Sequence, residues 1–506
     1  MSAPKPLLPT RYAIALGVLS GLAALLAFPR FNLWFTAPIA VAALCVATYG
    51  QRPRVAAAAG FGHGAGLFVP ILHWTGLYVG AFPWLTLAAV QALYFLPLGM
   101  ALAFTTHRIK RWLIPPAVAT LWLLQEAIRG RAPFGGFPWA KLAFSQADAP
   151  TLNWASIGGA PLVSAIVAFV GGALFLALLY APDKHCAFTT AATLGALGLM
   201  GVGALVPLDQ PDGKQLTVAV VQGNVPRAGL EFNAQRQAVL NNHIQGTLDL
   251  AEEVRQGKHP QPDIVIWPEN ASDIDPLIDE QAGAMITNAA QMVKAPILVG
   301  AVLDGPGSRI RNAGIVWSPE TGPGQTYIKQ HPVPFAEYVP YRKQLRYITK
   351  KVDLVRRDFV PGTSSGVLRI GDARIGDVIC FEVAYDGLVA QTVQEGAQLL
   401  VVQTNNATFG RSAESAQQLA MVRLRAVEHG RYSIMASTTG TSAIVNAEGE
   451  VEQSTPLFTA RILTATVRLS DQSTIATRFG LWQEMLWCAG AVVVLGYAVW
   501  RRQIGR

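Results

Sequence analysis

The chain has few charged residues and few cysteines. Only 14% of its 506 residues are Asp, Glu, Lys or Arg, whereas 51% are hydrophobic. That balance is too apolar for one soluble domain and is typical of a protein that crosses a membrane several times. The four cysteines do not form a disulfide framework, because Cys45, Cys186 and Cys488 fall in or beside apolar runs. Cys380 remains as the lone thiol of the polar part, where an oxidising compartment would make it a candidate reactive group.

Signals of two other classes of protein are also missing. No basic run is interleaved with stacking aromatics in the polar part, so the net charge of +8 does not indicate a nucleic-acid partner. The first apolar run, 12–28, lacks a small-x-small cleavage site followed by a soluble domain. We therefore interpret it as a retained anchor and not as a signal peptide.

Eight apolar runs define the organisation of the chain. Each is close to the ~20 residues that a helix needs to cross ~30 Å of hydrocarbon, and they cover residues 12–28, 34–50, 55–79, 84–104, 112–128, 152–181, 187–206 and 479–500. We predict a membrane domain over 1–211 with seven transmembrane helices. An extracytoplasmic catalytic domain over 212–474 follows, and an eighth transmembrane helix with a cytoplasmic tail occupies 475–506.

The distribution of Lys and Arg sets the predicted orientation. With the N-terminus inside, the short outer loops hold only Arg30, Arg129, Arg131 and Lys141. The inner loops collect Lys5, Arg11, Arg52, Arg54, Arg108, Lys110, Arg111, Lys184, Arg501, Arg502 and Arg506. Because Lys and Arg of short loops stay on the cytoplasmic side, both chain ends are predicted to be cytoplasmic and 212–474 to lie outside the membrane.

The polar part has the pattern of a layered α/β domain. Apolar, β-branched runs typical of strands occupy 216–221, 263–267, 297–302, 375–379, 399–403 and 432–436. Two longer stretches, 234–256 and 414–429, mix apolar and polar residues at helical spacing. Strands that alternate with helices predict buried sheets covered by helices.

Three chemically active side chains lie in the polar part of the chain. Glu269 sits in WPEN after DIVIW, where Pro268 ends the strand. Lys329 lies in TYIKQHPVPFAEYVP, whose prolines fix an extended loop that would hold Lys329 and Glu337 in place. Cys380 ends the run RIGDVIC. Singly, each is more commonly a solvated acid, a surface lysine or a small buried residue, but together they supply a base, a cation and a nucleophile.

These residues resemble a known family. WPEN, YxK followed by VPFxEYVP, and a Cys-aromatic-Glu after a strand resemble the Glu-Lys-Cys triad of the nitrilase superfamily, and VAVVQGNVP resembles its first strand. With GFPWAKLAFSQ (136–146), LAFPRFNLW (26–34) and QLAMVRLRAVEHGR (418–431), essentially all 506 residues resemble the apolipoprotein N-acyltransferases. The resemblance implies a nitrilase-like four-layer α-β-β-α sandwich domain, of class α/β. It would be inserted in an all-α polytopic domain of eight transmembrane helices in the bacterial inner membrane.

The resemblance also implies a reaction without cofactor or metal. Glu269 would deprotonate Cys380, whose thiolate attacks the sn-1 ester of a membrane phospholipid. The thioester would then pass its acyl chain to the α-amino group of the S-diacylglyceryl-cysteine that begins an apolipoprotein. Lys329 would stabilise the oxyanions together with the backbone N–H of Phe381. The protein is expected to act as a monomer.

Supporting and substrate-binding roles follow from the same resemblance. Glu337 would hold Lys329 or relay a proton, and Glu382 would orient the loop behind the nucleophile. Three residues are expected to bind substrate: Trp139 in GFPWAKLAFSQ, Phe232 where some members carry Trp, and Thr408. Thr408 lies in TNNATFG, where SNDxWFG is usual, so acyl-chain and head-group preference are the properties that these departures affect.

Three other interpretations fit part of the same pattern. A membrane-tethered amidase would use the same three groups, but a small soluble amide needs no access from the lipid. A transporter with a non-catalytic domain of this shape would carry ionisable residues within its spans. The spans hold few such residues, of which Glu126 and Glu484 near span ends are the main ones. A thiol-imidazole pair would use His331 or His429, although the acid and the lysine leave neither imidazole a required role.

Overall fold

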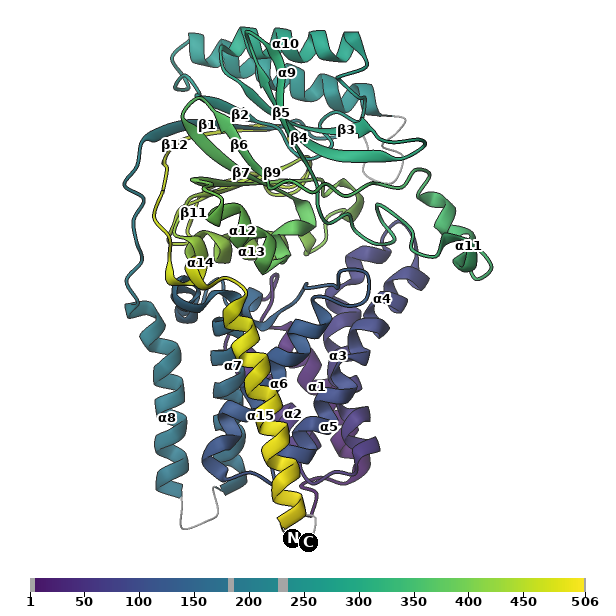
Figure 1. Cartoon of the computed structure of the whole chain (residues 1–506), viewed down its shortest axis with the longest axis vertical. Helices are drawn as coiled ribbons and strands as arrows, with labels where there is room; N and C mark the ends of the chain where they lie inside the picture. Colours follow the sequence, from purple (N-terminus) through teal and green to yellow (C-terminus); the bar gives the residue numbers. More distant parts are fainter. Residues whose placement is uncertain (1–4, 181–185, 226–234, 505–506) are drawn as a thin grey trace. The chain divides into compact units, whose positions relative to one another are not determined.

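The computed structural model in Figure 1 describes residues 5–180, 186–225 and 235–504. The chain divides into two units. One contains Met1–Pro207 and Phe479–Arg506, and the other contains Leu208–Arg478. Phe232, which was expected to bind substrate, lies outside the described residues.

The first unit is built from helices. They are α1 (Thr10–Leu25), α2 (Thr36–Thr48), α3 (Pro53–Ile71), α4 (Ala81–Leu93), α5 (Phe95–Thr105), α6 (Ile114–Arg129), α7 (Ala155–Tyr180), α8 (Cys186–Val202) and α15 (Trp482–Ile504). Within the described residues, three helical stretches are long and apolar enough to cross a membrane: Ala81–Thr105, Pro150–Tyr180 and Trp482–Ile504. Thr10–Leu25, Thr36–Thr48 and Thr190–Leu205 are shorter apolar helices.

Proline and glycine interrupt two of the apolar runs. Residues 84–104, predicted as one span, fall within the helical stretch Ala81–Thr105. Within it α4 and α5 meet at a turn at Tyr94, and Pro97 has no N–H to bond the carbonyl group of residue 93. In α7 the backbone leaves the helical region at Gly158 and Gly159, just before Pro161. Each predicted span contains helix, and the helices over 84–104 and 152–181 are interrupted by a turn and a kink, respectively.

Small residues let the helices of the first unit approach closely. A Cβ atom at Gly21 of α1 would lie 2.0 Å from the carbonyl oxygen of His63 in α3. A Cβ atom at Gly60 of α3 would lie 2.0 Å from the carbonyl oxygen of Phe95 in α5. Glycine is required at both contacts, and backbones in such contact are typical of helix packing in membranes.

The second unit contains two six-stranded sheets. One has the order β12-β1-β2-β3-β4-β5 and the other β11-β10-β9-β8-β7-β6. The first sheet consists of β1 (Gln215–Gln222), β2 (Ile264–Ile266), β3 (Ile297–Asp304), β4 (Ile310–Ser318), β5 (Gly322–Ile328) and β12 (Arg461–Arg468). The second consists of β6 (Val367–Ile370), β7 (Ala373–Ile379), β8 (Leu399–Thr404), β9 (Ser433–Ser437), β10 (Ala443–Val445) and β11 (Val451–Ser454). Parallel pairing joins β1 to β2, β2 to β3, β7 to β8 and β8 to β9.

Alternating side chains of each strand enter different layers. Val218 and Val220 of β1 pack in a core shared with Ile375 of β7, between the two sheets. Ala219 and Val221 of β1 face the other way, into a core shared with α9 (Arg236–Arg255) and α10 (Glu280–Val293). Because successive side chains point to opposite faces of a strand, one apolar run fills two layers.

Helices cover both outer faces of the paired sheets. Figure 1 shows α9 and α10 over the first sheet, and α12 (Asp386–Gln394) and α13 (Glu414–His429) over the second. The arrangement within Leu208–Arg478 is therefore helix, sheet, sheet, helix. It places the ends of β2, β5, β7 and β8 around the cluster of polar residues described below.

Candidate active site

Glu269 lies just beyond the carboxyl end of β2, and the residue is 5% exposed. Its Oε1 atom accepts hydrogen bonds from Asn312 Nδ2 (2.7 Å) and Lys329 Nζ (3.1 Å). Its Oε2 atom accepts from the backbone N–H of Asn405, 2.8 Å away at the end of β8. These donors fix the orientation of the carboxylate, while the adjacent Asn270 adopts a left-handed φ of 59°.

Lys329 follows β5 directly and is 2% exposed. Its Nζ atom lies 3.1 Å from Glu269 Oε1 and 2.9 Å from Glu337 Oε1. Burial alone would lower the pKa of Lys329, but the charges of Glu269 and Glu337 outweigh it and hold that pKa well above its ordinary value. The ammonium group is therefore charged, and two of its three N–H donors are engaged.

Asn312, in β4, links the two carboxylates. Its Nδ2 atom donates to Glu269 Oε1 (2.7 Å) and to Glu337 Oε1 (3.0 Å). The Oε2 atom of Glu337 accepts from the backbone N–H of Val333 (2.6 Å), within the proline-rich loop. These hydrogen bonds hold the Glu337 carboxylate beside Lys329.

Cys380 follows β7 and begins a 3₁₀ turn, Cys380–Ala384. Its φ of 54° is in the left-handed region, which non-glycine residues rarely adopt and which is common at functional sites. Burial raises the pKa of the thiol, the charge of Glu269 raises it further, and the charge of Lys329 lowers it. The thiol is therefore protonated at neutral pH, within electrostatic range of both a carboxylate and an ammonium group.

Glu382 joins the loop after β5 to the turn after β7. It is fully buried, and its Oε1 atom accepts from the backbone N–H groups of Gln330 (2.7 Å) and His331 (3.0 Å). Its Oε2 atom accepts from the backbone N–H of Ile379 (2.8 Å), and Tyr327 donates its hydroxyl to both oxygens at 3.0 Å. Through these hydrogen bonds Glu382 connects the segment that carries Lys329 to the segment that carries Cys380.

A buried polar network lies behind the thiol. Gln418 Nε2 is 3.9 Å from Cys380 Sγ, and Gln418 Oε1 accepts from Thr404 Oγ1 (2.9 Å) and Asn406 Nδ2 (3.1 Å). Asn406 also donates to Glu414 Oε2 (2.6 Å). Burial raises the pKa of Glu414 to about 8, against the opposing effect of the Asn406 hydrogen bond. A second titratable carboxyl is thus close enough to influence the nucleophile.

Asn312, Gln418 and Glu414 were not identified from the sequence. Asn312 lies within an apolar strand, RNAGIVW, and carries no turn or motif signal. Gln418 begins the motif QLAMVRLRAVEHGR, but nothing in that motif distinguishes it from a surface glutamine. Glu414 is in the first turn of α13, where an acid is favourable next to any helix N-terminus.

The remaining residues expected to contact substrate occupy different places. Trp139 belongs to the helical unit, is 2% exposed, and has its ring 5.3 Å from that of Trp74. Its carbonyl oxygen accepts from Arg129 Nη1 (2.6 Å). Thr408 is half-buried in a short 3₁₀ turn after β8. Phe381 is buried beside Tyr385, with ring centroids 5.7 Å apart.

The alternative thiol-imidazole pair has no support in these contacts. The ring of His331 stacks on Tyr385 at 4.5 Å, and burial lowers the pKa of its imidazole. His429 Nδ1 is 2.8 Å from Thr477 Oγ1. In the part of the chain that the structure describes, no hydrogen bond joins either imidazole to Cys380.

The chain is similar to known families and proteins over most of its length. Residues 20–173 match the model of the apolipoprotein N-acyltransferase N-terminal domain, and residues 217–477 match that of the carbon-nitrogen hydrolases. The apolipoprotein N-acyltransferase of Mycolicibacterium smegmatis is 41% identical over 502 residues, which are 94% of this chain and 83% of the relative. That of Pseudomonas putida is 30% identical over 511 residues and 97% of both chains.

A mutant of the Nesterenkonia AN1 amidase from the nitrilase superfamily aligns with 53% of this chain and 95% of its own, at 15% identity and a TM-score of 0.39. The carbon-nitrogen hydrolase match covers Leu208–Arg478 almost completely, and it accounts for a nitrilase-like domain of two sheets and helices. Since the Mycolicibacterium relative matches nearly the whole length, the chain belongs to the apolipoprotein N-acyltransferase family.

Proposed function

We propose that this protein transfers an acyl chain from the sn-1 position of a phospholipid to the N-terminal amine of a diacylated apolipoprotein. The family supports the overall reaction. The observation that carries the catalytic assignment is the buried Lys329, fixed between Glu269 and Glu337 beside the Cys380 turn. Cys380 is the nucleophile, Glu269 the general base, and Lys329 the oxyanion stabiliser.

The first half-reaction forms a thioester. Glu269 takes the proton of Cys380 while Sγ bonds to the ester carbonyl carbon, whose oxygen becomes an oxyanion. The intermediate then expels the glycerol oxygen, which takes the proton from Glu269 and leaves as a lysophospholipid. The raised pKa of Cys380 fits this order, because a thiol that is protonated at rest needs a base close at hand when substrate arrives.

The second half-reaction forms an amide. The neutral α-amino group of the diacylglyceryl cysteine attacks the thioester carbonyl carbon, and its proton passes to Glu269. The carbon-sulfur bond breaks, and the thiolate of Cys380 recovers that proton. A thioester keeps the activation of the original ester, so the exchange needs no nucleotide.

Lys329 is suited to both oxyanions. Two of its N–H donors bind Glu269 and Glu337, which leaves the third for a transient negative oxygen. The two carboxylates hold the ammonium group before substrate arrives, and a positioned cation in a water-poor site stabilises developing charge without reorganising. The backbone N–H of Phe381 is the second proposed donor, and Glu382 holds the turn that presents it.

The proposal includes the setting of this site in the membrane. We assign eight transmembrane helices, seven in 1–211 and one in 475–506, with residues 212–474 on the extracytoplasmic face of the bacterial inner membrane and the protein as a monomer. Helix in each of the eight apolar runs supports the number of spans, and the excess of Lys and Arg in the inner loops supports the orientation. Trp139, Phe232 and Thr408 remain proposed substrate contacts.

The reaction is tested by supplying both substrates. The purified full-length protein is incubated with a phospholipid and a synthetic S-diacylglyceryl-cysteine peptide, and products are separated by mass spectrometry. We expect a triacylated peptide and an equal amount of lysophospholipid. Release of free fatty acid with no triacylated peptide would contradict transfer, and ammonia release from small amides would support the amidase alternative.

A further inference from the structure

Arginines around α11 (Arg342–Leu345) surround an open cavity in the Leu208–Arg478 unit. The cavity has a volume of about 260 Å³ and is lined by two aspartates and by Arg309, Arg342, Arg346, Arg356 and Arg357. Its lining therefore carries a formal charge of +3. Such a surface favours an anionic ligand.

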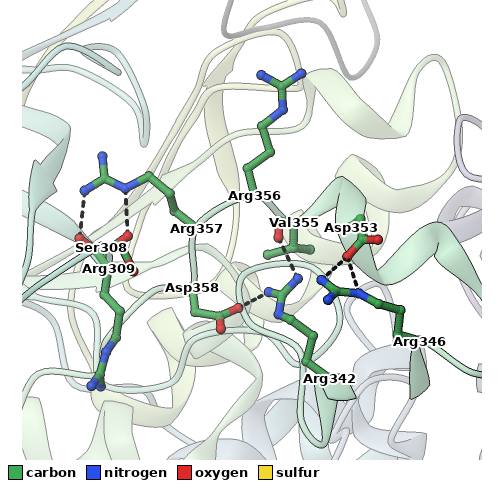
Figure 2. A pocket seen from close by; sticks show the side chains of 9 residues that line it. All are labelled: Ser308, Arg309, Arg342, Arg346, Asp353, Val355, Arg356, Arg357 and Asp358. Atoms are coloured by element: carbon green, nitrogen blue, oxygen red, sulfur yellow. Dashed lines mark hydrogen bonds and ion pairs between the residues drawn. The ribbon is translucent and has the colours of Figure 1, made fainter. Parts of the chain in front are cut away.

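Two of the arginines are fixed by contacts within the cavity wall. Arg342 donates from Nη1 to the carbonyl oxygen of Val355 (2.8 Å) and pairs with Asp358. Arg346 Nη2 lies 2.6 Å from Asp353 Oδ1. Figure 2 shows both guanidinium groups turned toward these partners. The two aspartates are thus already neutralised and position the wall of the cavity.

Two other guanidinium groups form no ion pair with the described residues, and Figure 2 shows them extending from the lining in different directions. Arg309 and Arg356 are exposed, and neither side chain forms an ion pair with a carboxylate in the described ranges. In Figure 2 no dashed line reaches either guanidinium group. Arg357 is anchored by a hydrogen bond from Nε to the carbonyl oxygen of Ser308 (2.9 Å), and its Nη2 atom pairs with Asp304 Oδ1 (2.7 Å). Planar guanidinium groups are well matched to phosphate oxygens, which they bind with two parallel hydrogen bonds.

Residues 341–354, which contain α11, also expose large apolar side chains. Tyr341, Tyr347, Ile348 and Leu354 are exposed by 69%, 94%, 71% and 56%. Residues 341–357 also contain seven Lys or Arg and one Asp. Exposed aromatic and aliphatic side chains mixed with cations are typical of segments that lie in the interface of an anionic membrane. A free phosphate ion would use the arginines but would leave the apolar side chains in water.

We propose that this cavity binds the phosphate of an anionic phospholipid head group, with the apolar side chains of 341–354 contacting its acyl region. A head group with its own cation, such as choline, brings a positive charge toward a positive wall and binds less well. The inference rests on the membrane location given under the proposed function. It adds a lipid site whose lining does not include Glu269, Lys329 or Cys380.

The test measures lipid binding in a chain that cannot transfer acyl groups. Full-length protein carrying Cys380→Ala, in neutral detergent, is titrated with phosphatidylglycerol or phosphatidylcholine, and bound lipid is counted by native mass spectrometry. Hydrogen exchange of amides 342–358 locates the bound lipid. The test variant adds Arg309→Gln and Arg356→Gln. The matched control adds Lys258→Gln and Lys294→Gln, which remove two exposed cations elsewhere in the same unit.

We expect phosphatidylglycerol to protect 342–358 from exchange. The arginine variant should bind it about 25-fold more weakly, because each cation near an anionic surface contributes about a fivefold effect. The lysine control should bind as the parent does. Equal affinity of the arginine variant and the control, equal binding of the two lipids, or displacement of phosphatidylglycerol by an equal concentration of inorganic phosphate would each overturn the proposal. Lipid binding with no acyl transfer by the unmodified chain would instead contradict the proposed function.

Discussion

Asn312 offers a sharp test of how the candidate site is held together. Its single Nδ2 group donates to Glu269 at 2.7 Å and to Glu337 at 3.0 Å, and the residue is 2% exposed. Asn312→Ala removes both hydrogen bonds while Lys329 keeps its contacts with the two carboxylates. We expect the variant to fold, with Glu269 less firmly oriented toward the thiol.

The size of the effect follows from these contacts. A hydrogen bond to a charged group contributes about 1.5–3 kcal/mol, so two give about 3–6 kcal/mol. The lower end of this range applies, because Asn312 Oδ1 is buried with no hydrogen-bond partner among the described residues. Removing that oxygen relieves the free-energy cost of burying an unpaired acceptor. At about 2.1 cal/mol/K of unfolding entropy per residue, a loss of about 3 kcal/mol in the free energy of unfolding lowers the melting temperature of a domain of this size by about 5 °C. A misplacement of a catalytic group by about 1 Å costs roughly 100-fold in kcat.

The assay combines thermal unfolding of the full-length protein with the rate of thioester formation from phospholipid. Asn312→Asp keeps the shape but sets a third carboxyl against two others, so we expect it to be more harmful than Asn312→Ala. Asn241→Ala, an exposed asparagine of α9, should change the free energy of unfolding by less than about 0.5 kcal/mol. An unchanged acylation rate in Asn312→Ala, or an Asp variant milder than the Ala variant, would refute the account of this cluster.

Three further predictions concern the groups around Cys380. Glu269→Gln should retain phospholipid binding but lose about 10²–10⁴-fold in thioester formation, measured by single-turnover release of lysophospholipid. Lys329→Ala should slow both half-reactions by about 10²–10³-fold, and a defect in the second alone would disprove a shared oxyanion site. The charge of Glu414 raises the pKa of the Cys380 thiol, and the pKa of Glu414 itself is about 8. Glu414→Gln should therefore speed alkylation of Cys380 mainly above pH 8, where the native carboxyl is charged, and equal rates at pH 9 would contradict this coupling.

Local sequence pattern predicted much of the α/β unit. The apolar runs 216–221, 263–267, 297–302, 375–379, 399–403 and 432–436 all contain strands, because continuous β-branched runs are typical of buried strands. β4 and β5 were missed, since the first includes Arg311, Asn312 and Gly314 and the second is rich in Gly and polar residues. β12 was also missed, although the alternation of apolar and polar residues in RILTATVR is typical of a strand.

The residues of the candidate site also divide into those that the sequence indicated and those that it did not. Glu269 and Cys380 each lie just after a run that the sequence predicted as a strand. Lys329 follows β5, which the sequence did not predict, and was singled out by the proline-rich motif around it. Asn312 and Glu414 could not be found in that way. Their roles depend on contacts with residues of other strands and helices, and such contacts arise only from the pairing of the two sheets.

The central claim is that Cys380 carries the acyl chain, and the most direct measurement is the intact mass of the full-length protein after incubation with a phospholipid alone. We predict a gain of one acyl chain that is absent from Cys380→Ala. Hydroxylamine or a diacylated lipopeptide should reverse the gain. No gain together with no lysophospholipid, or an equal gain in Cys380→Ala, would contradict a thioester at this residue.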